Sequence, residues 1–139
     1  MGIKVFLVED EMVIRNGIVK SINWEKEGYR LVGEASDGEL AYPMILKEKP
    51  DILLTDIKMP GMNGYELLDL LRCSNIGNSK EIPVLAVTAH ISRKEEELVK
   101  TGFAGCLYKP FSCDELYAAV HHALRGKRTP VKSDMEPID

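Results

Sequence analysis

Acidic, hydroxyl and ammonium groups follow four apolar runs of this chain, where predicted strands end. Asp56 closes the run Ile-Leu-Leu-Thr-Asp and comes shortly before the turn sequence Met-Pro-Gly-Met-Asn-Gly. Glu9 and Asp10 follow a second run, Thr88 ends a third, and Lys109 follows a fourth. Carboxylates are ligands that suit Mg²⁺, and a carboxylate also serves as a nucleophile that accepts a phosphoryl group. The set therefore predicts a site for a metal ion and a phosphoryl group.

Four positions are expected to hold the metal ion. Asp10 and Asp56 would ligate Mg²⁺ directly and Glu9 through water, and the backbone carbonyl of Lys58 would add a neutral oxygen. Three acids in one crevice repel one another, so a divalent cation is their natural counter-charge. The acidic pair by itself would also fit a helix start, where the helix dipole favours acids. The presence of Asp56 and Lys109 favours the metal site.

Phosphoryl transfer passes through a loose transition state, so catalysis consists mostly of alignment and charge neutralisation. Asp56 would be the phosphoacceptor, Lys109 would pair with one phosphoryl oxygen, and the Thr88 hydroxyl would donate to another. Ala89 is small and would leave the nucleophile accessible. The Lys109-Pro110 bond is compatible with a cis peptide and with a trans turn.

Five apolar runs alternate with segments of helical period along the chain. The runs cover residues 3–8, 29–35, 51–55, 83–88 and 105–108. Several are continuously apolar, as parallel strands covered on both faces are, and the segments between them have apolar residues at helical spacing. The expected fold class is α/β: a doubly wound five-stranded parallel sheet of order 2-1-3-4-5 with five helices, flavodoxin-like. Its topological switch lies between the first and third strands, where ligands bind.

Four sequences are typical of helix starts, because an oxygen-bearing cap is followed three residues later by glutamate. They begin at Ser36, Asn63, Ser92 and Ser112. Pro43 falls inside the second expected helix, where it removes a hydrogen bond, so a distorted helix is expected there.

Length, charge and hydropathy limit the function classes. The 139 residues make one ordinary domain, and a net charge of −4 gives no reason to expect direct nucleic-acid binding. No apolar run approaches the roughly 20 residues of a membrane span, and no signal-peptide pattern opens the chain. The three cysteines, Cys73, Cys106 and Cys113, form no Cys-x-x-Cys motif and indicate reduced thiols of a cytoplasmic protein. Residues 126–139 contain two prolines and no periodicity, so a domain over 1–125 with a disordered tail or linker stub is expected.

Over about residues 3–125 the chain resembles the receiver domain of bacterial two-component response regulators and hybrid sensor kinases. The matching motifs, in order and spacing, are Glu9-Asp10, Asp56 before Met-Pro-Gly-Met-Asn-Gly, Thr88-Ala89 and Lys109-Pro110-Phe111. The resemblance implies a signalling switch whose aspartate is phosphorylated, with Mg²⁺, by a histidine kinase or phosphotransfer protein. It implies no turnover of an external substrate, only self-phosphorylation and self-dephosphorylation. It also implies a signalling face on the fourth helix, fifth strand and fifth helix.

Some positions depart from the family pattern. The aromatic switch residue, three before the lysine, is Cys106 here, and Tyr108 lies one residue before the lysine. The first half resembles receivers of helix-turn-helix transcription factors, and the second half resembles those of hybrid kinases. An output domain absent from this chain and a phosphorylation-dependent homodimer are therefore expected partners. The chain would be a fragment of a longer protein, a stand-alone receiver or a composite.

Other classes stay open from the residues alone. A receiver-like interaction module would take no phosphate, although Asp10, Asp56, Thr88 and Lys109 are all present. A phosphatase with a catalytic Asp-x-Asp would need an acid where Lys58 stands. A flavin-binding protein shares the fold, but an acidic loop is unfit to bind its phosphate. A further hypothesis is that Lys58 reaches the rim of the site and alters the lifetime of the phosphorylated state.

Overall fold

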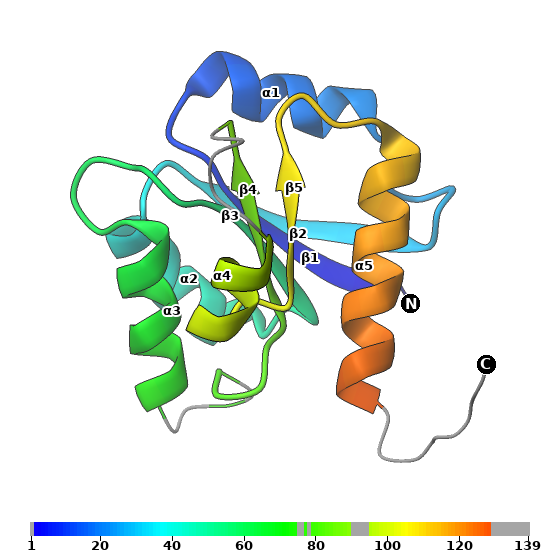
Figure 1. Ribbon diagram of the computed structural model, residues 1–139. Coiled ribbons are helices and arrows are strands. Elements are labelled where there is room, and N and C mark those ends of the chain that lie inside the picture. The colour runs from blue at the N-terminus through cyan, green and yellow to red at the C-terminus, as the bar shows by residue number, and fades with distance from the viewer. Residues whose placement is uncertain (1, 75–76, 78, 90–94, 129–139) are drawn as a thin grey trace.

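The computed structural model describes residues 2–74, 77, 79–89 and 95–128, and it shows one parallel sheet between two layers of helices (Figure 1). The strands are β1 (Ile3–Val8), β2 (Tyr29–Ala35), β3 (Ile52–Asp56), β4 (Val84–Thr88) and β5 (Gly105–Tyr108). They pair in parallel in the order β2-β1-β3-β4-β5. The predicted fold class and strand order are confirmed, and each strand lies within one residue of its predicted run.

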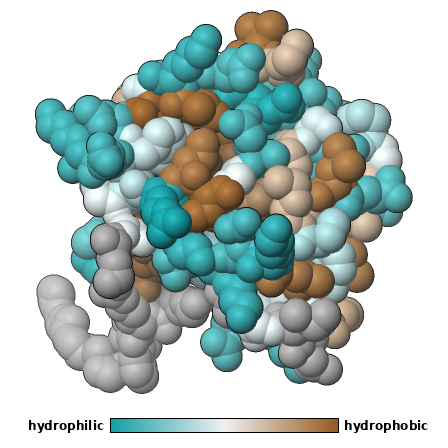
Figure 2. Space-filling model, turned by 180° about the vertical axis from the view of Figure 1, so that it is seen from behind, coloured by the Kyte–Doolittle hydropathy of each residue, from teal (hydrophilic) through white to brown (hydrophobic). Residues whose placement is uncertain are grey.

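Five helices connect and cover these strands. They are α1 (Met12–Ser21), α2 (Gly38–Glu48), α3 (Gly64–Cys73), α4 (Glu95–Thr101) and α5 (Cys113–Arg128). Helices α2, α3 and α4 pack on one face of the sheet, and α1 and α5 pack on the other (Figure 1). Seen from behind, hydrophobic side chains gather near the centre of the surface, and hydrophilic side chains surround them (Figure 2).

Alternate residues of each strand enter opposite cores. On β1, Phe6 faces the α2–α4 layer, whereas Leu7 faces the α1–α5 layer. On β3, Leu53 and Leu54 divide in the same way, and all four side chains are fully buried. Burying each such side chain stabilises the fold by about 1.5–3 kcal/mol. Because both faces are covered, the central strands β3 and β4 are buried throughout, which explains their continuous apolar runs.

Two of the predicted helix caps are confirmed. Asn63 and Glu66 exchange hydrogen bonds at the start of α3, and Ser112 and Glu115 do the same before α5. The cap predicted at Ser36 is wrong by one residue, because the Asp37 carboxylate accepts the Leu40 N–H at 2.9 Å. The backbone of Asp37 is still extended, so the helix begins only after it.

The remaining expectations concern Pro43, the cap at Ser92, the domain boundary and the absence of a membrane span. Helix α2 continues through Pro43. The cap predicted at Ser92 lies outside the described residues. The domain boundary expected after residue 125 falls inside α5, which runs to Arg128, and residues 129–139 lie outside the described part. Within that part, no helix has the length and apolar character needed to cross a membrane.

Candidate functional site

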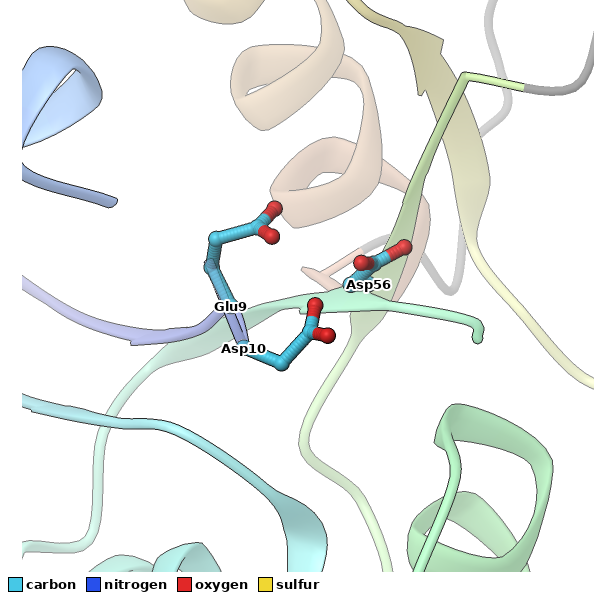
Figure 3. Close-up of side chains that lie close together, drawn as sticks. All are labelled: Glu9, Asp10 and Asp56. Atoms are coloured by element: carbon cyan, nitrogen blue, oxygen red, sulfur yellow. The ribbon is translucent and has the colours of Figure 1, made fainter. Parts of the chain in front are cut away.

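Three carboxylates lie together above the C-terminal edge of the sheet. Figure 3 shows Glu9 and Asp10, at the end of β1, extending toward Asp56 at the end of β3. One oxygen of each carboxylate lies within 4.8 Å of the others. The strands bring them together because β1 and β3 are neighbours and Val8 pairs with Thr55. The three acids therefore form a candidate metal centre.

The ammonium group of Lys109 provides the counter-charge of this cluster. Its Nζ lies 2.8 Å from Glu9 Oε1 and 3.4 Å from Asp56 Oδ2. The backbone N–H of Lys109 donates to the Thr88 carbonyl at 2.8 Å, which ties the end of β5 to the end of β4. The Lys109-Pro110 peptide is cis. The lysine predicted from sequence thus lies in the same site as the acids.

Backbone N–H groups also hold two of the carboxylates. Glu9 Oε2 accepts the Glu11 N–H at 3.2 Å, so both oxygens of this buried side chain are engaged within the protein. Asp56 Oδ1 accepts the Ile57 N–H at 2.8 Å. Asp10 is less buried than Glu9 and Asp56 and lines the open side of the cluster. This arrangement favours Asp10 and Asp56 as direct metal ligands and Glu9 as a ligand through water.

Burial and crowding of like charges change the acidity of the site. The pKa of Asp56 is raised from 3.8 to about 7, first by burial and then by the negative charge of Glu9. Lys109 and the Ile57 N–H act in the opposite direction, whereas a hydrogen bond with Asp10 adds to the increase. Burial lowers the pKa of Lys109, but its hydrogen bond with Glu9 and the charges of Asp56 and Glu9 outweigh this, so that pKa is raised.

A cavity of about 240 Å³ opens directly onto the acidic cluster. Its lining includes Asp10, Asp56, Lys58, Ala89 and Lys109. Asp56 is therefore largely buried and yet lines an open cavity. The exposed Lys58 lies at this opening, as predicted. That its carbonyl ligates the metal stays a prediction.

Thr88 lies at the end of β4, one residue beyond Val87, which pairs with Asp56. It is almost completely buried. The structure thus brings Thr88 to the same edge of the sheet, and donation from its hydroxyl to a phosphoryl oxygen stays a prediction.

Gly64, the first residue of α3, lets the helix start lie against the end of β3. A Cβ at this position would lie 2.6 Å from the Asp56 carbonyl oxygen, far closer than atoms can approach. The Gly64 N–H donates to the Ile57 carbonyl at 2.9 Å. The glycine that ends the turn sequence is therefore required by the close approach of backbone to Asp56.

An apolar groove of about 460 Å³ adjoins the acidic cavity. It runs between α1 and the segment after β5, and its lining includes Ile14, Gly17, Ile18, Lys109 and Phe111. Nearby, Met12 and Val13 are 62% and 83% exposed. Sequence patterns did not predict this groove, because it forms between segments that are about 90 residues apart in the chain.

Arg15 was also not predictable as part of the site. It follows Glu9 by six residues in no recognisable motif, yet its Nη1 donates to the Glu9 carbonyl at 2.7 Å. Its contact with Glu34 on β2 follows from the packing of α1 beside that strand, which no motif in the sequence indicates.

Comparisons with known proteins agree with this geometry. A family model described as the response regulator receiver domain matches residues 5–121. The nitrate/nitrite response regulator NarL of Escherichia coli K12 is 36% identical over 126 residues, which cover 88% of this chain and 55% of NarL. The uncharacterised transcriptional regulatory protein YesN of Bacillus subtilis is 37% identical over 112 residues, which cover 81% of this chain and 29% of YesN. The chain thus spans about half, or less, of the length of these relatives.

Solved structures are similar along most of this chain. The receiver domain of the response regulator AraT from Geobacillus stearothermophilus has a TM-score of 0.75 and 28% identity, with 91% of this chain and 95% of that chain covered. The receiver domain of the sensor histidine kinase PA1611 from Pseudomonas aeruginosa has a TM-score of 0.75 and 26% identity, with 89% and 98% covered. That structure has a magnesium ion coordinated in its active-site cleft.

Proposed function

This chain belongs to the response regulator receiver domain family, and we propose that it is a phosphoacceptor switch in which Asp56 takes a phosphoryl group from a histidine kinase or phosphotransfer protein. One observation carries the proposal. The Asp56 carboxylate lies in a cavity between two further carboxylates and the Lys109 ammonium group. Such a set of charges suits an acceptor of a phosphoryl group.

The residues of the site have separate tasks in the transfer. An oxygen of Asp56 forms a bond to phosphorus while the bond from phosphorus to the donor histidine nitrogen breaks. The Ile57 N–H holds Oδ1 of Asp56, and the Lys109 ammonium group lies 3.4 Å from Oδ2. Lys109 is then placed to pair with a phosphoryl oxygen, and Thr88 donates to another.

The donor set fits Mg²⁺, because three carboxylates converge within 4.8 Å and hard oxygen ligands are those that Mg²⁺ prefers. Asp10 and Asp56 would hold it directly, Glu9 through water, and Lys58 through its carbonyl. When bound, Mg²⁺ offsets the negative charge that carboxylates and phosphoryl oxygens bring together.

The donor protein docks on the apolar groove beside α1. The groove shares Lys109 and Ala89 with the acidic cavity, so a helix that carries the donor histidine and lies in it would present its phosphoryl group to Asp56. Met12 and Val13, which precede Ile14 in α1, are also exposed. Gly17 has no side chain, so a docked helix can approach the backbone of α1 closely at this position. A Cβ at Gly17 would project into open space, because no atom of this chain lies within 4 Å of it.

The switch changes the surface around α4, β5 and α5, which contacts an output domain, a partner or a second copy of this chain. Thr88 pairs with Tyr108 and Ala86 with Cys106 across β4 and β5, so a movement of Thr88 passes directly into β5. None of Cys73, Cys106 and Cys113 is in a disulfide, and this accords with a cytoplasmic location.

Intact-mass analysis tests the proposal against the alternative, a receiver-like interaction module that takes no phosphate. With Mg²⁺ and acetyl phosphate, wild type gains the mass of one phosphoryl group and Asp56→Asn does not. No added mass on wild type would overturn the proposed function. Added mass that persists in Asp56→Asn would overturn only the assignment of the acceptor.

A further inference from the structure

Arg15 joins the acidic loop after β1 to the neighbouring strand β2. Its Nη1 donates to the Glu9 carbonyl at 2.7 Å, and its Nε donates to Glu34 Oε1 at 3.2 Å. The Arg15 side chain is 17% exposed and that of Glu34 38%. An exposed ion pair contributes little, but this guanidinium is mostly buried and also reaches a backbone carbonyl.

The backbone around Glu9 is held from two directions. The Glu9 N–H donates to the Ala35 carbonyl at 3.0 Å, which fixes one side of the residue to β2. The Glu9 carbonyl on the other side is held by Arg15. The other end of the loop that carries Asp10 is held by the first turn of α1, where the backbone N–H of residue 15 donates to the Glu11 carbonyl at 2.8 Å whatever its side chain.

We propose that Arg15, anchored by Glu34, is a positioning residue that orients the carboxylates of Glu9 and Asp10 for Mg²⁺. This inference rests on the proposed function, because it assumes that the acidic cluster binds the metal. Arg15 touches the backbone behind the ligands and no ligand oxygen. The planar guanidinium can donate to the carbonyl and to Glu34 at once, whereas a lysine ammonium on a flexible stem lacks this fixed fork.

The positive charge of Arg15 and its hydrogen bond to the Glu9 carbonyl predict opposite effects on Mg²⁺ affinity when Arg15 is replaced. A cation near a metal site repels the metal ion, so removal of charge alone would tighten Mg²⁺ binding. Loss of the hydrogen bond to the Glu9 carbonyl would instead loosen the ligand loop and weaken binding. The direction of the change therefore separates the two roles.

Calorimetric titration of the full chain with Mg²⁺ provides the test. Arg15→Met should raise the dissociation constant about 10-fold, as loss of a group that orients metal ligands does. Arg15→Lys, which keeps the charge, should also weaken binding. The matched control Lys20→Met removes a cation from an exposed position of the same helix and should leave the dissociation constant within about twofold of wild type.

Two further measurements separate positioning from loss of structure. Glu34→Gln keeps Arg15 and should weaken Mg²⁺ binding by a smaller factor, which provides a test even where Arg15→Met fails to fold. At saturating Mg²⁺, phosphorylation of Arg15→Lys by acetyl phosphate should return to the wild-type rate, since Arg15 contacts no reacting atom.

Equal or tighter Mg²⁺ binding by folded Arg15→Met, or wild-type binding by both Arg15→Lys and Glu34→Gln, would overturn the inference and leave the proposed function standing. Wild type that binds no Mg²⁺ would overturn the metal site and this inference together.

Discussion

The ammonium group of Lys109 lies 2.8 Å from a carboxylate oxygen of Glu9, although 100 residues separate them in the chain. The Glu9 side chain is 1% exposed and that of Lys109 13%, so this is a nearly buried ion pair rather than a surface contact. It holds the lysine beside Asp56 before any phosphoryl group arrives. The lysine is thus in contact with the carboxylates of both Glu9 and Asp56.

Replacement of Lys109 should lower the stability of the domain. Lys109→Met leaves the carboxylates of Glu9 and Asp56 without their shared cation, and a buried charge that loses its partner is destabilising. We expect the free energy of unfolding at pH 8, without metal, to fall by about 1–3 kcal/mol. Urea unfolding measures it, and Lys58→Met, at an exposed position, is the control. A loss no larger than that of the control would contradict the prediction.

Asp56 should make the stability depend on pH. Its pKa is raised from 3.8 to about 7, so between these values the folded state binds more protons than the unfolded state. The free energy of unfolding therefore falls as pH rises from about 4 to about 7. Without metal, Asp56→Asn should remove most of this slope and be more stable than wild type at pH 8 by roughly 1–3 kcal/mol.

Urea unfolding at pH 5 and pH 8 in the presence of EDTA measures this difference. Asp69→Asn, an exposed acid on α3, is the control and should follow wild type. An Asp56→Asn protein with the wild-type slope would show that Asp56 is not the group responsible.

Lys58 should assist the arrival of anionic donors. It lies exposed at the opening of the acidic cavity, and a cation there attracts acetyl phosphate at low ionic strength. Lys58→Ala should slow phosphorylation by acetyl phosphate about two- to fivefold, and added salt should shrink the difference. Lys80→Ala, exposed beyond α3, should have no effect. The same samples give the decay rate of the phosphorylated state, and equal decay rates would discard a role of Lys58 in its lifetime.

The substitution Gly17→Ala should raise the stability of the domain but impair docking of the donor protein. The residue is exposed inside α1, and a Cβ there has open space around it, so Gly17→Ala should stabilise the free domain by about 0.5–1 kcal/mol. The added methyl group should slow phosphotransfer from a histidine donor and leave the rate with acetyl phosphate unchanged. Asn16→Ala, the exposed neighbour, is the control. Unchanged transfer from the protein donor would contradict docking along α1.

The sequence was sufficient for the strands and for most of the site. Strand ends carry Asp56, Glu9 and Asp10, and a parallel sheet must bring neighbouring ends to one edge. Local hydrogen bonding also made the caps at Asn63 and Ser112 predictable. The cap at Asp37 was misplaced because Ser36 and Asp37 are both good caps, and only the backbone path, extended through Asp37, decides between them.

The sequence by itself determined the order of the elements and the chemical groups at the strand ends, because both follow from periodicity and turn residues within short windows. Only the tertiary structure decided that Glu9 is nearly inaccessible and paired with Lys109, that Asp56 is buried enough for its pKa to reach about 7, and that Arg15 holds the Glu9 carbonyl. These properties depend on desolvation and on distances between groups that are far apart in the chain or oriented by packing. No short sequence pattern determines them.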